Sequence, residues 1–504
     1  MKHILHAKAK KLGIRDGEEL IVVLNEIDAI NYGLNPFDKV ELSYKNNKIV
    51  VNLDVSRNIV QQWEIWLFDD VLDKFSVRNW NLINIYFTKR SNLAVNAIRK
   101  KMQWKEINWE EINAIIKDIS ENKMIDSLMT YYVASSFFKP TTNKEMYLTA
   151  KSMAENGVMF KYPKWEIVAD KHCIGGVPWN ETTMILVPLV ASLGIKFPKN
   201  FSKAITSPAA TWECVSVLMD ISFDEKWIKK LIKQNNACLV WGGSLDLAPA
   251  DDKLIKIQYP LAMQNVAKVV SSIMAKKYAM WITHSLIDIP MWPTAKVKTK
   301  KEAKDRKKKF EAVWKWLWMK MSVQITDAKQ PIWAWIWAVL QVREVLRVLQ
   351  QHDKRPDDLE KKAVFLASKI IENVWLAKWK QALKLAYGQL ISGEAWKYMQ
   401  KIMKAQNAKR LNITSEDLKL AKYKKEVKAT ENWNIKNIDM QRLNYVCRTL
   451  WAPLDLKAWI YLEKKIWSDY DKWDILFTMY SEDENKIKLA LKMINKGWFY
   501  QIKK

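Results

Sequence analysis

The chain has 504 residues, and its 82 lysines and arginines against 55 aspartates and glutamates give a formal net charge of +27. This length predicts roughly two to four domains, each large enough to bury a core. The four cysteines are scattered without pair spacing, which argues against a disulfide framework or a zinc site and fits a reducing compartment. No apolar stretch has the length of a signal-peptide core or a membrane span, so we expect a soluble cytoplasmic protein with no membrane partner.

The positive charge could indicate a nucleic-acid-binding face. Only twelve of the basic residues are arginine, and the lysines are spread along the chain among many Asn and Ile residues, which is typical of AT-rich coding. The densest basic run, KVKTKKEAKDRKKKF at 296–310, fits the solvated face of a helix. We therefore expect no dedicated nucleic-acid partner.

The periodicity of apolar residues changes along the chain and predicts an α/β fold with several domains. Residues 1–84 contain short apolar or alternating runs such as ELIVVLN and KIVVNLDV between turn residues, which predicts a small β-rich N-terminal domain. Residues 85–165 have helical spacing and predict an all-helical lobe. Strands and helices alternate over 166–350, which predicts a central α/β lobe with a mixed sheet. Residues 351–427 are predicted to be helical and 428–504 to form a C-terminal α+β domain.

The segment DKHCIGGVPWNETT at 170–183 has the pattern of a strand, a glycine loop and a helix. Gly175 and Gly176 allow the backbone to bend so that several N–H groups face one oxyanion. The N-terminus of the following helix adds partial positive charge, and Lys171 adds a full one. The segment predicts a phosphate-binding loop, and a strand–helix turn without a ligand is the alternative.

Three further blocks follow this loop in order: FSKAITSPAATWE at 201–213, CLVWGGSLDLAPADD at 238–252, and VVSSIMAKK at 269–277 with THSLIDIPMWPTAKV at 283–297. Together with the loop, they resemble the thymidine/AMP phosphorylase family over nearly the whole chain. The VPWN turn, the AITSP stretch and the N-terminal extension resemble the archaeal-type AMP branch of that family, which cleaves nucleoside monophosphates by phosphorolysis.

The resemblance implies a pentosyltransferase that uses phosphate as a co-substrate and needs no cofactor or metal. The implied reaction converts AMP, and also CMP or UMP, with phosphate to the free base and ribose 1,5-bisphosphate, in nucleotide salvage. It also implies a homo-oligomer, a dimer or larger. Two alternatives stay open: a pyrimidine nucleoside (thymidine) phosphorylase, and a non-catalytic relative that binds nucleotides or RNA.

The resemblance also assigns site residues. Those implied to bind phosphate are Lys171, Gly175, Gly176, Thr183, Ser202 and Thr211. Those implied to bind the nucleotide are Gly176, Ser202, Lys203, Ala204, Ile205, Thr206, Ser207, Thr211, Ser272, Lys276 and Lys296. Ser272 and Lys276 lie four residues apart and therefore on one helix face. The residues implied to be catalytic include Lys171 and the adjacent His172. His172 could hydrogen-bond the sugar or base, or become protonated near neutral pH.

Gln264 departs from the family pattern, because the AMP branch has an aspartate at this place that protonates the leaving base. A glutamine amide can hydrogen-bond to N7 of a purine but cannot give up a proton. Asp251 or Asp252 could be the donor instead, or the base could leave stabilised by hydrogen bonds alone. A different substrate or a loss of activity are the other outcomes.

Tryptophan stands where the family has glycine at many positions: Trp63, Trp66, Trp179, Trp281, Trp292, Trp318, Trp333, Trp335, Trp337, Trp451, Trp459, Trp467 and Trp473. The chain has only 12 glycines but 27 tryptophans, whereas glycine is usually about 7% of residues. Glycine serves where φ is positive or where the backbone approaches another group closely, and an indole meets neither demand. We interpret many of these tryptophans as UGA codons that the source organism reads as glycine. A genuinely tryptophan-rich protein is the alternative, and Trp241, beside Gly242 and Gly243, is expected to be genuine.

Overall fold

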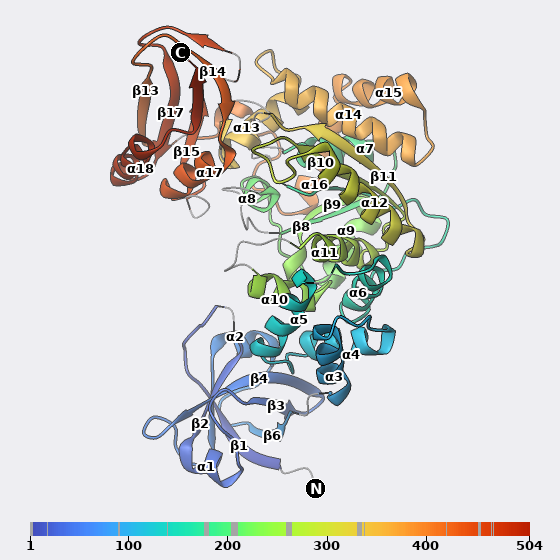
Figure 1. Ribbon diagram of the computed structural model, residues 1–504, viewed down its shortest axis with the longest axis vertical. Coiled ribbons are helices and arrows are strands. Elements are labelled where there is room, and N and C mark those ends of the chain that lie inside the picture. The colour runs from blue at the N-terminus through green and yellow to red at the C-terminus, as the bar shows by residue number, and fades with distance from the viewer. Residues whose placement is uncertain are drawn as a thin grey trace. The chain divides into compact units, whose positions relative to one another are not determined.

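The computed structural model describes residues 4–17, 19–88, 91–138, 140–175, 181–202, 210–258, 265–329, 335–336, 338–419, 421–451, 455–464, 466 and 468–503. These residues form helices and several sheets, which confirms the predicted mixed α/β class (Figure 1). The chain divides into two compact units, Met1–Gly157 with Ala248–Ala275, and Val158–Leu247 with Lys276–Lys504. The boundaries of the five domains inferred from the sequence stay predictions.

The first unit begins with a closed barrel whose strand order is β1-β5-β2-β4-β3-β6. Apolar side chains alternate along the strands, so that one face of each strand fills the interior, with Val22, Leu24 and Leu42 fully buried. The strands are β1 Ile4–Lys11, β2 Ile21–Asn25, β3 Lys39–Tyr44, β4 Asn47–Ser56, β5 Glu64–Leu67 and β6 Leu82–Phe87, with the short helices α1 Glu26–Asn31 and α2 Asp69–Lys74 between them.

Helices make up the rest of the first unit. Two of them begin at reciprocal capping boxes, Asn108 with Glu111 and Thr142 with Glu145, which satisfy the free backbone N–H groups of the first turn. The helices are α3 Asn92–Met102, α4 Trp109–Ser120, α5 Asp126–Phe138, α6 Asn143–Glu155, α10 Pro249–Gln258 and α11 Val266–Ala279, the last of which contributes residues to both units.

Parallel strands form the centre of the second unit, so the mixed sheet predicted for this lobe is wrong for the strands that the structure describes there. β7 Ala169–Cys173, β10 His284–Met291 and β11 Lys320–Asp327 are ordered β11-β10-β7, and β8 Phe197–Phe201 pairs with β9 Ala237–Trp241. The bridge between Val168 and Lys196 links the two sheets. α7 Thr183–Ser192 is apolar all round and buried over nearly its full length, as expected of a helix in the middle of a core.

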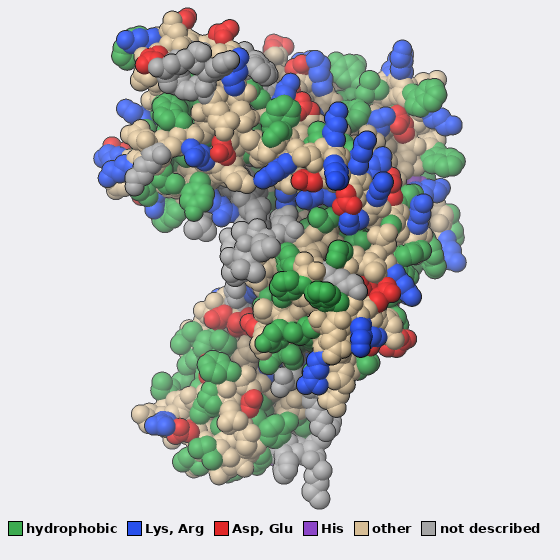
Figure 2. All heavy atoms as spheres, in the orientation of Figure 1, with side chains coloured by type: hydrophobic (Ala, Val, Ile, Leu, Met, Phe, Trp, Pro, Cys, Tyr) green, Lys and Arg blue, Asp and Glu red, His purple; other side chains and the backbone are tan. Residues whose placement is uncertain are grey.

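The other helices of this part of the chain are α8 Thr211–Ser216, α9 Glu225–Asn235, α12 Lys300–Trp316, α13 Ala338–Leu349, α14 Asp357–Asn373, α15 Trp379–Ile391 and α16 Glu394–Ala405, with the 3-10 turns η1 Gly242–Ser244 and η3 Ser415–Asp417. The basic run predicted to be a solvated helix is confirmed, because α12 buries Ala303, Phe310 and Val313 and presents lysines to solvent (Figure 2). No helix among the described residues is both long enough and apolar enough to span a bilayer.

Antiparallel sheets and two helices form the C-terminal part. One sheet is ordered β12-β15-β17-β13 and the other β16-β14-β18. The strands are β12 Trp335–Ile336, β13 Tyr423–Lys428, β14 Trp433–Ile438, β15 Trp459–Leu462, β16 Asp469–Tyr470, β17 Ile475–Ser481 and β18 Tyr500–Lys503, and the helices are α17 Met440–Thr449 and α18 Glu484–Lys496. The segment 351–427, predicted to be helical, is helical only to Ala405 apart from η3, and strand β13 begins inside it at Tyr423.

Tryptophans occupy glycine-like backbone conformations. Among the described non-glycine residues, sixteen have positive φ, and nine of these are tryptophan: Trp63, Trp80, Trp104, Trp281, Trp318, Trp375, Trp379, Trp451 and Trp473. All of them except Trp281 expose half or more of the side chain. The left-handed region costs a non-glycine residue about 1–2 kcal/mol. Five of the nine are positions predicted from the sequence, and Trp80, Trp104, Trp375 and Trp379 are additional.

Helix ends account for most of these positions. Trp104, Trp281, Trp318, Trp375 and Trp451 each follow the last turn of a helix, at the place where glycine normally ends the helix. At three of these ends the next residue makes the return hydrogen bond of the glycine motif: the N–H groups of Lys105, Ile282 and Leu376 donate to the carbonyl groups of Lys100, Lys277 and Ile371, at 3.2, 3.0 and 3.1 Å.

Four other described tryptophans at expected glycine positions, Trp66, Trp292, Trp335 and Trp459, do not have positive φ, and Trp179, Trp333, Trp337 and Trp467 lie outside the described residues. Trp66 donates from Nε1 to Glu64 at 3.1 Å, and Trp459 is buried in β15 with its ring stacked on that of Tyr480. Trp292 packs on Ala295 and Ala328.

Candidate anion site at the end of β7

Lys171 lies at the centre of the site predicted from the glycine loop. It is buried on β7, with 1% of its surface exposed, and its Nζ donates to Thr182 Oγ1 at 3.1 Å, directly before α7. Gly175 has φ of +81°, a conformation that strains any other residue. Lys296 Nζ donates to the carbonyl of Ile174 at 3.4 Å. Two lysines and the N-terminus of a helix therefore meet where β7 ends, which suits an anion.

The start of α8 brings the hydroxyl group of Thr211 to the residue directly before Thr182. Thr211 begins α8, and its Oγ1 donates to Glu181 Oε1 at 3.1 Å. Thr183 is the first residue of α7 and is buried, whereas Ser202 is exposed after β8. The structure therefore connects Thr211 and the start of α7 through a residue, Glu181, that the sequence analysis did not single out.

Buried charged side chains surround Asp170 on β7. Asp170 is fully buried and pairs with Lys199 at 3.2 Å and with Lys277. Burial lowers the pKa of Lys199 to about 7, and Asp170 opposes this shift. Burial and the cations of Lys277, Lys199 and Lys171 hold the pKa of His172 well below its usual range. His172 is therefore a neutral hydrogen-bonding group at neutral pH, and the alternative in which it becomes protonated there is disfavoured.

The residues proposed to contact the base lie on α10 and α11. Ser272 Oγ donates to Asp251 Oδ2 at 2.7 Å, and Asp251 is 3% exposed. Asp252 is exposed on the same helix. The predicted helix carrying Ser272 and Lys276 is confirmed as α11, but Ser272 belongs to the first unit and Lys276 to the second. Gly176, Lys203, Ala204, Ile205, Thr206, Ser207 and Gln264 lie outside the described residues.

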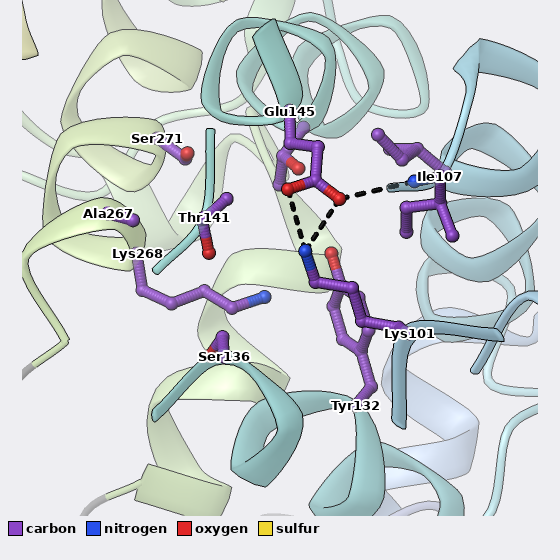
Figure 3. Close-up of a pocket in the computed structure, with 11 residues that line it drawn as sticks. Lys101, Ile107, Tyr132, Ser136, Thr141, Glu145, Ala267, Lys268 and Ser271 are labelled. Atoms are coloured by element: carbon purple, nitrogen blue, oxygen red, sulfur yellow. Dashed lines mark hydrogen bonds and ion pairs between the residues drawn. The ribbon is translucent and has the colours of Figure 1, made fainter. Parts of the chain in front are cut away.

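A separate small hollow lies within the helices of the first unit, and none of the predicted site residues line it (Figure 3). Lys101 Nζ contacts both carboxylate oxygens of Glu145 at 2.6 Å, and the Ile107 N–H donates to Glu145 Oε1 at 3.3 Å. Lys268 Nζ lies 3.7 Å from the ring centroid of Tyr132. Burial lowers the pKa of Lys268 to about 7.

None of the described His, Cys, Asp and Glu residues gather in groups of three or more that could hold a metal ion. The four cysteines, Cys173, Cys214, Cys238 and Cys447, form no disulfide bonds.

Comparison with known proteins shows which family this chain resembles. The AMP phosphorylase of Methanocaldococcus jannaschii is 33% identical over 476 residues, 94% of this chain and 93% of that protein. The putative thymidine phosphorylase of Bradyrhizobium diazoefficiens is 33% identical over 500 residues, 98% and 96% of the two chains. The AMP phosphorylase of Methanococcus maripaludis strain C6 is 30% identical over 490 residues, 97% and 96% of the two chains. No family model matches the chain.

The fold has a relative among solved structures. Anthranilate phosphoribosyltransferase from Thermus thermophilus superposes with a TM-score of 0.53 at 11% identity, over 62% of this chain and 99% of that one. The phosphorylases that are 30–33% identical over most of the chain define its class as a pentosyltransferase of the phosphorylase type. Within that class, the chain belongs to the thymidine/AMP phosphorylase family.

Sequence reasoning missed the three charged residues around Lys171 and Asp170. Lys199 lies on β8 in a segment without a recognised motif. Lys277 ends the VVSSIMAKK block, but the sequence gives no sign that α11 brings it to Asp170. Glu181 is part of the loop segment itself, so its position between the glycine loop and α7 was the available signal.

Proposed function

We propose that this protein is an AMP phosphorylase, which converts AMP and phosphate to adenine and ribose 1,5-bisphosphate. The observation that carries the proposal is the buried Lys171 of β7, whose Nζ reaches Thr182 at the N-terminus of α7. Lys296 is a second cation beside Gly175. Two of the relatives named above are AMP phosphorylases, which supports AMP as the substrate.

In the proposed reaction an oxygen of phosphate forms a bond to C1′ of the ribose, while the bond from C1′ to the base nitrogen breaks and the base leaves with both electrons. Lys171 and the free N–H groups at the start of α7 hold the phosphate and balance its charge, a contribution of positioning and electrostatics. Burial lowers the pKa of Lys296 to about 8, so this lysine remains mostly protonated at neutral pH and suits the 5′-phosphate of the nucleotide.

The base that leaves needs a proton or hydrogen bonds. Asp251 is the buried carboxylate of α10, and its Oδ2 already accepts a hydrogen bond from Ser272 Oγ. We propose that hydrogen bonding, with Gln264 as one donor, replaces proton donation in this chain. A Gln264→Asp variant that gains at least tenfold in kcat would support this assignment, and an unchanged kcat would contradict it.

The experiment is release of adenine from AMP and phosphate, with ribose 1,5-bisphosphate identified as the second product. CMP, UMP, adenosine and thymidine are compared as substrates. The Lys296→Met variant distinguishes AMP phosphorylase from thymidine phosphorylase activity. If Lys296 binds the 5′-phosphate, the variant should lose activity on AMP but not on thymidine, which has no 5′-phosphate. A protein that turns over thymidine and not AMP would be a pyrimidine nucleoside phosphorylase, the activity that the name of one relative suggests.

We also propose that the tryptophans with positive φ are glycines in the natural protein, encoded by UGA. Tryptophan is not favoured in the left-handed region, yet it fills nine of sixteen such non-glycine positions among the described residues, and five of these follow the ends of helices. Trp241 differs, because its indole covers Gly243 so closely that a Cβ at Gly243 would lie 2.6 Å from it. This fit supports a genuine tryptophan at position 241.

A peptide mass spectrum of the protein from its native source tests this proposal. Glycine is expected at positions 104, 318 and 375, and tryptophan at 241. Tryptophan at all four positions would contradict it.

We further propose a cytoplasmic homo-oligomer that acts in nucleotide salvage without a cofactor. Light scattering of the purified protein tests the oligomer, and a mass matching one chain of 59.3 kDa would exclude it.

A further inference from the structure

Glu181 lies directly before α7, where the proposed phosphate would bind. Its side chain is buried, with 8% exposed. One carboxyl oxygen, Oε1, accepts the hydrogen bond from Thr211 Oγ1 at 3.1 Å. The other oxygen, Oε2, is buried and has no hydrogen-bond partner among the described residues.

An ionised carboxylate at this place would conflict with phosphate in two ways. It would repel the phosphate, and its Oε2 would remain a buried charge without a hydrogen bond. Thr211 would not relieve the conflict, because its hydroxyl proton is already donated to Glu181, so the hydroxyl offers phosphate only lone pairs. A carboxylic acid removes both problems, since its O–H group becomes a donor.

We infer that Glu181 binds phosphate as a neutral carboxylic acid, with Oε2 carrying the proton and donating it in a hydrogen bond to a phosphate oxygen. The inference rests on the proposed function, because it assumes an anion between Lys171 and Thr211. It assigns Glu181 to phosphate binding and leaves the bond-breaking step to other groups.

The charged groups around Glu181 act in both directions. Burial is the main cause that raises its pKa to about 7, Glu213 raises it further, and Lys171 and Lys199 lower it. The bound anion would raise this pKa again. Anion binding is therefore strongest where Glu181 is already protonated, below about pH 7, and weakens as pH rises because each binding event must take up a proton. Lys199 also titrates near pH 7, so the wild-type profile alone does not isolate Glu181.

Sulfate is the probe, because it remains a dianion across this pH range whereas phosphate titrates within it. Its affinity is measured by calorimetry from pH 6 to 9 in the full chain and in Glu181→Gln, whose amide donates a hydrogen bond at every pH. Above pH 7 the sulfate affinity of the wild type should fall more steeply than that of the variant. The difference should be up to about tenfold per pH unit, because sulfate binding to the wild type takes up one additional proton. Equal slopes in the two proteins would overturn the inference.

A second readout needs no variant. At pH 8, sulfate should produce the infrared C=O stretch of a protonated carboxylic acid in the wild type, a signal that lysine titration cannot give. Its absence would overturn the inference. Glu344→Gln is the matched control, because Glu344 is also buried with its pKa raised to about 7 but lies on α13 beside Arg347, and it should leave both readouts unchanged. Neither readout needs turnover, so failure of the AMP reaction would leave this result intact.

Discussion

Lys171 illustrates how one residue depends on its surroundings. A lysine with 1% exposure is expensive unless acceptors meet it, and Thr182 is the partner that the structure gives. The neighbouring Asp170 has its own cations, Lys199 and Lys277, and this arrangement leaves the charge of Lys171 available to an anion. The sequence predicted Lys171 from its motif, but the pairing of Asp170 could not be predicted, because its partners come from β8 and α11.

We expect Lys171→Met to lower kcat/KM for phosphate by about 10²–10³-fold, the usual effect of removing one preorganised donor to a developing charge. Steady-state kinetics with phosphate as the varied substrate checks this. Lys304→Met, on the solvated face of α12, is the control and should be unchanged. A Lys171→Met enzyme with wild-type kinetics would place phosphate elsewhere.

Lys268 in the hollow of the first unit predicts a pH dependence of stability. Its pKa falls from its usual value near 10.5 to about 7 in the folded chain, so between these values the unfolded chain binds more protons and stability rises with pH. Lys268→Met removes this penalty. The variant should be more stable than the wild type at pH 7, by on the order of a few kcal/mol, with the gain shrinking to about 1 kcal/mol or less at pH 10. Urea unfolding at both pH values measures this, and an equal difference at both would contradict it.

At the scale of elements, the spacing of apolar residues predicted most helices and strands. The ends of several helices could not be predicted, because tryptophan stands there in place of the glycine that normally ends a helix. The alternation in 1–84 predicted β structure, but closure into a barrel depends on which strands pair, such as β1 with both β5 and β6. β13 was missed because YKKEVK has polar residues at most positions and pairs only with the apolar β17. Trp104 and Trp375 escaped notice because no motif surrounds them.

Replacing a helix-ending tryptophan by glycine should stabilise the chain. Trp318→Gly, after α12, relieves a left-handed conformation with φ of 58° and should add about 1 kcal/mol to the free energy of unfolding. Trp227→Gly in α9 is the matched control, because this exposed tryptophan has helical geometry and its replacement should cost about 0.5–1 kcal/mol. Urea unfolding compares the two, and equal losses would contradict the glycine assignment.

At the scale of the whole molecule, the barrel has a core of its own. The cluster that fills it contains only residues between Leu5 and Ile85. We therefore expect residues 1–88 to fold when produced separately, with a cooperative thermal transition observed by circular dichroism. We also expect residues 89–504 to retain sulfate binding, because Lys171 and its partners lie in the second unit. A barrel fragment without a cooperative transition would contradict this independence.

The buried charges around β7 also determine how ionic strength acts on this protein. The net charge of +27 attracts anions from a distance, but salt screens such attraction beyond about 8 Å at physiological concentration. Lys171, Lys199 and Asp170 are buried, so salt screens their charges much less. Adding salt should therefore slow the arrival of anionic ligands while leaving their rate of departure almost constant, so that at high salt recognition rests on the buried lysines alone.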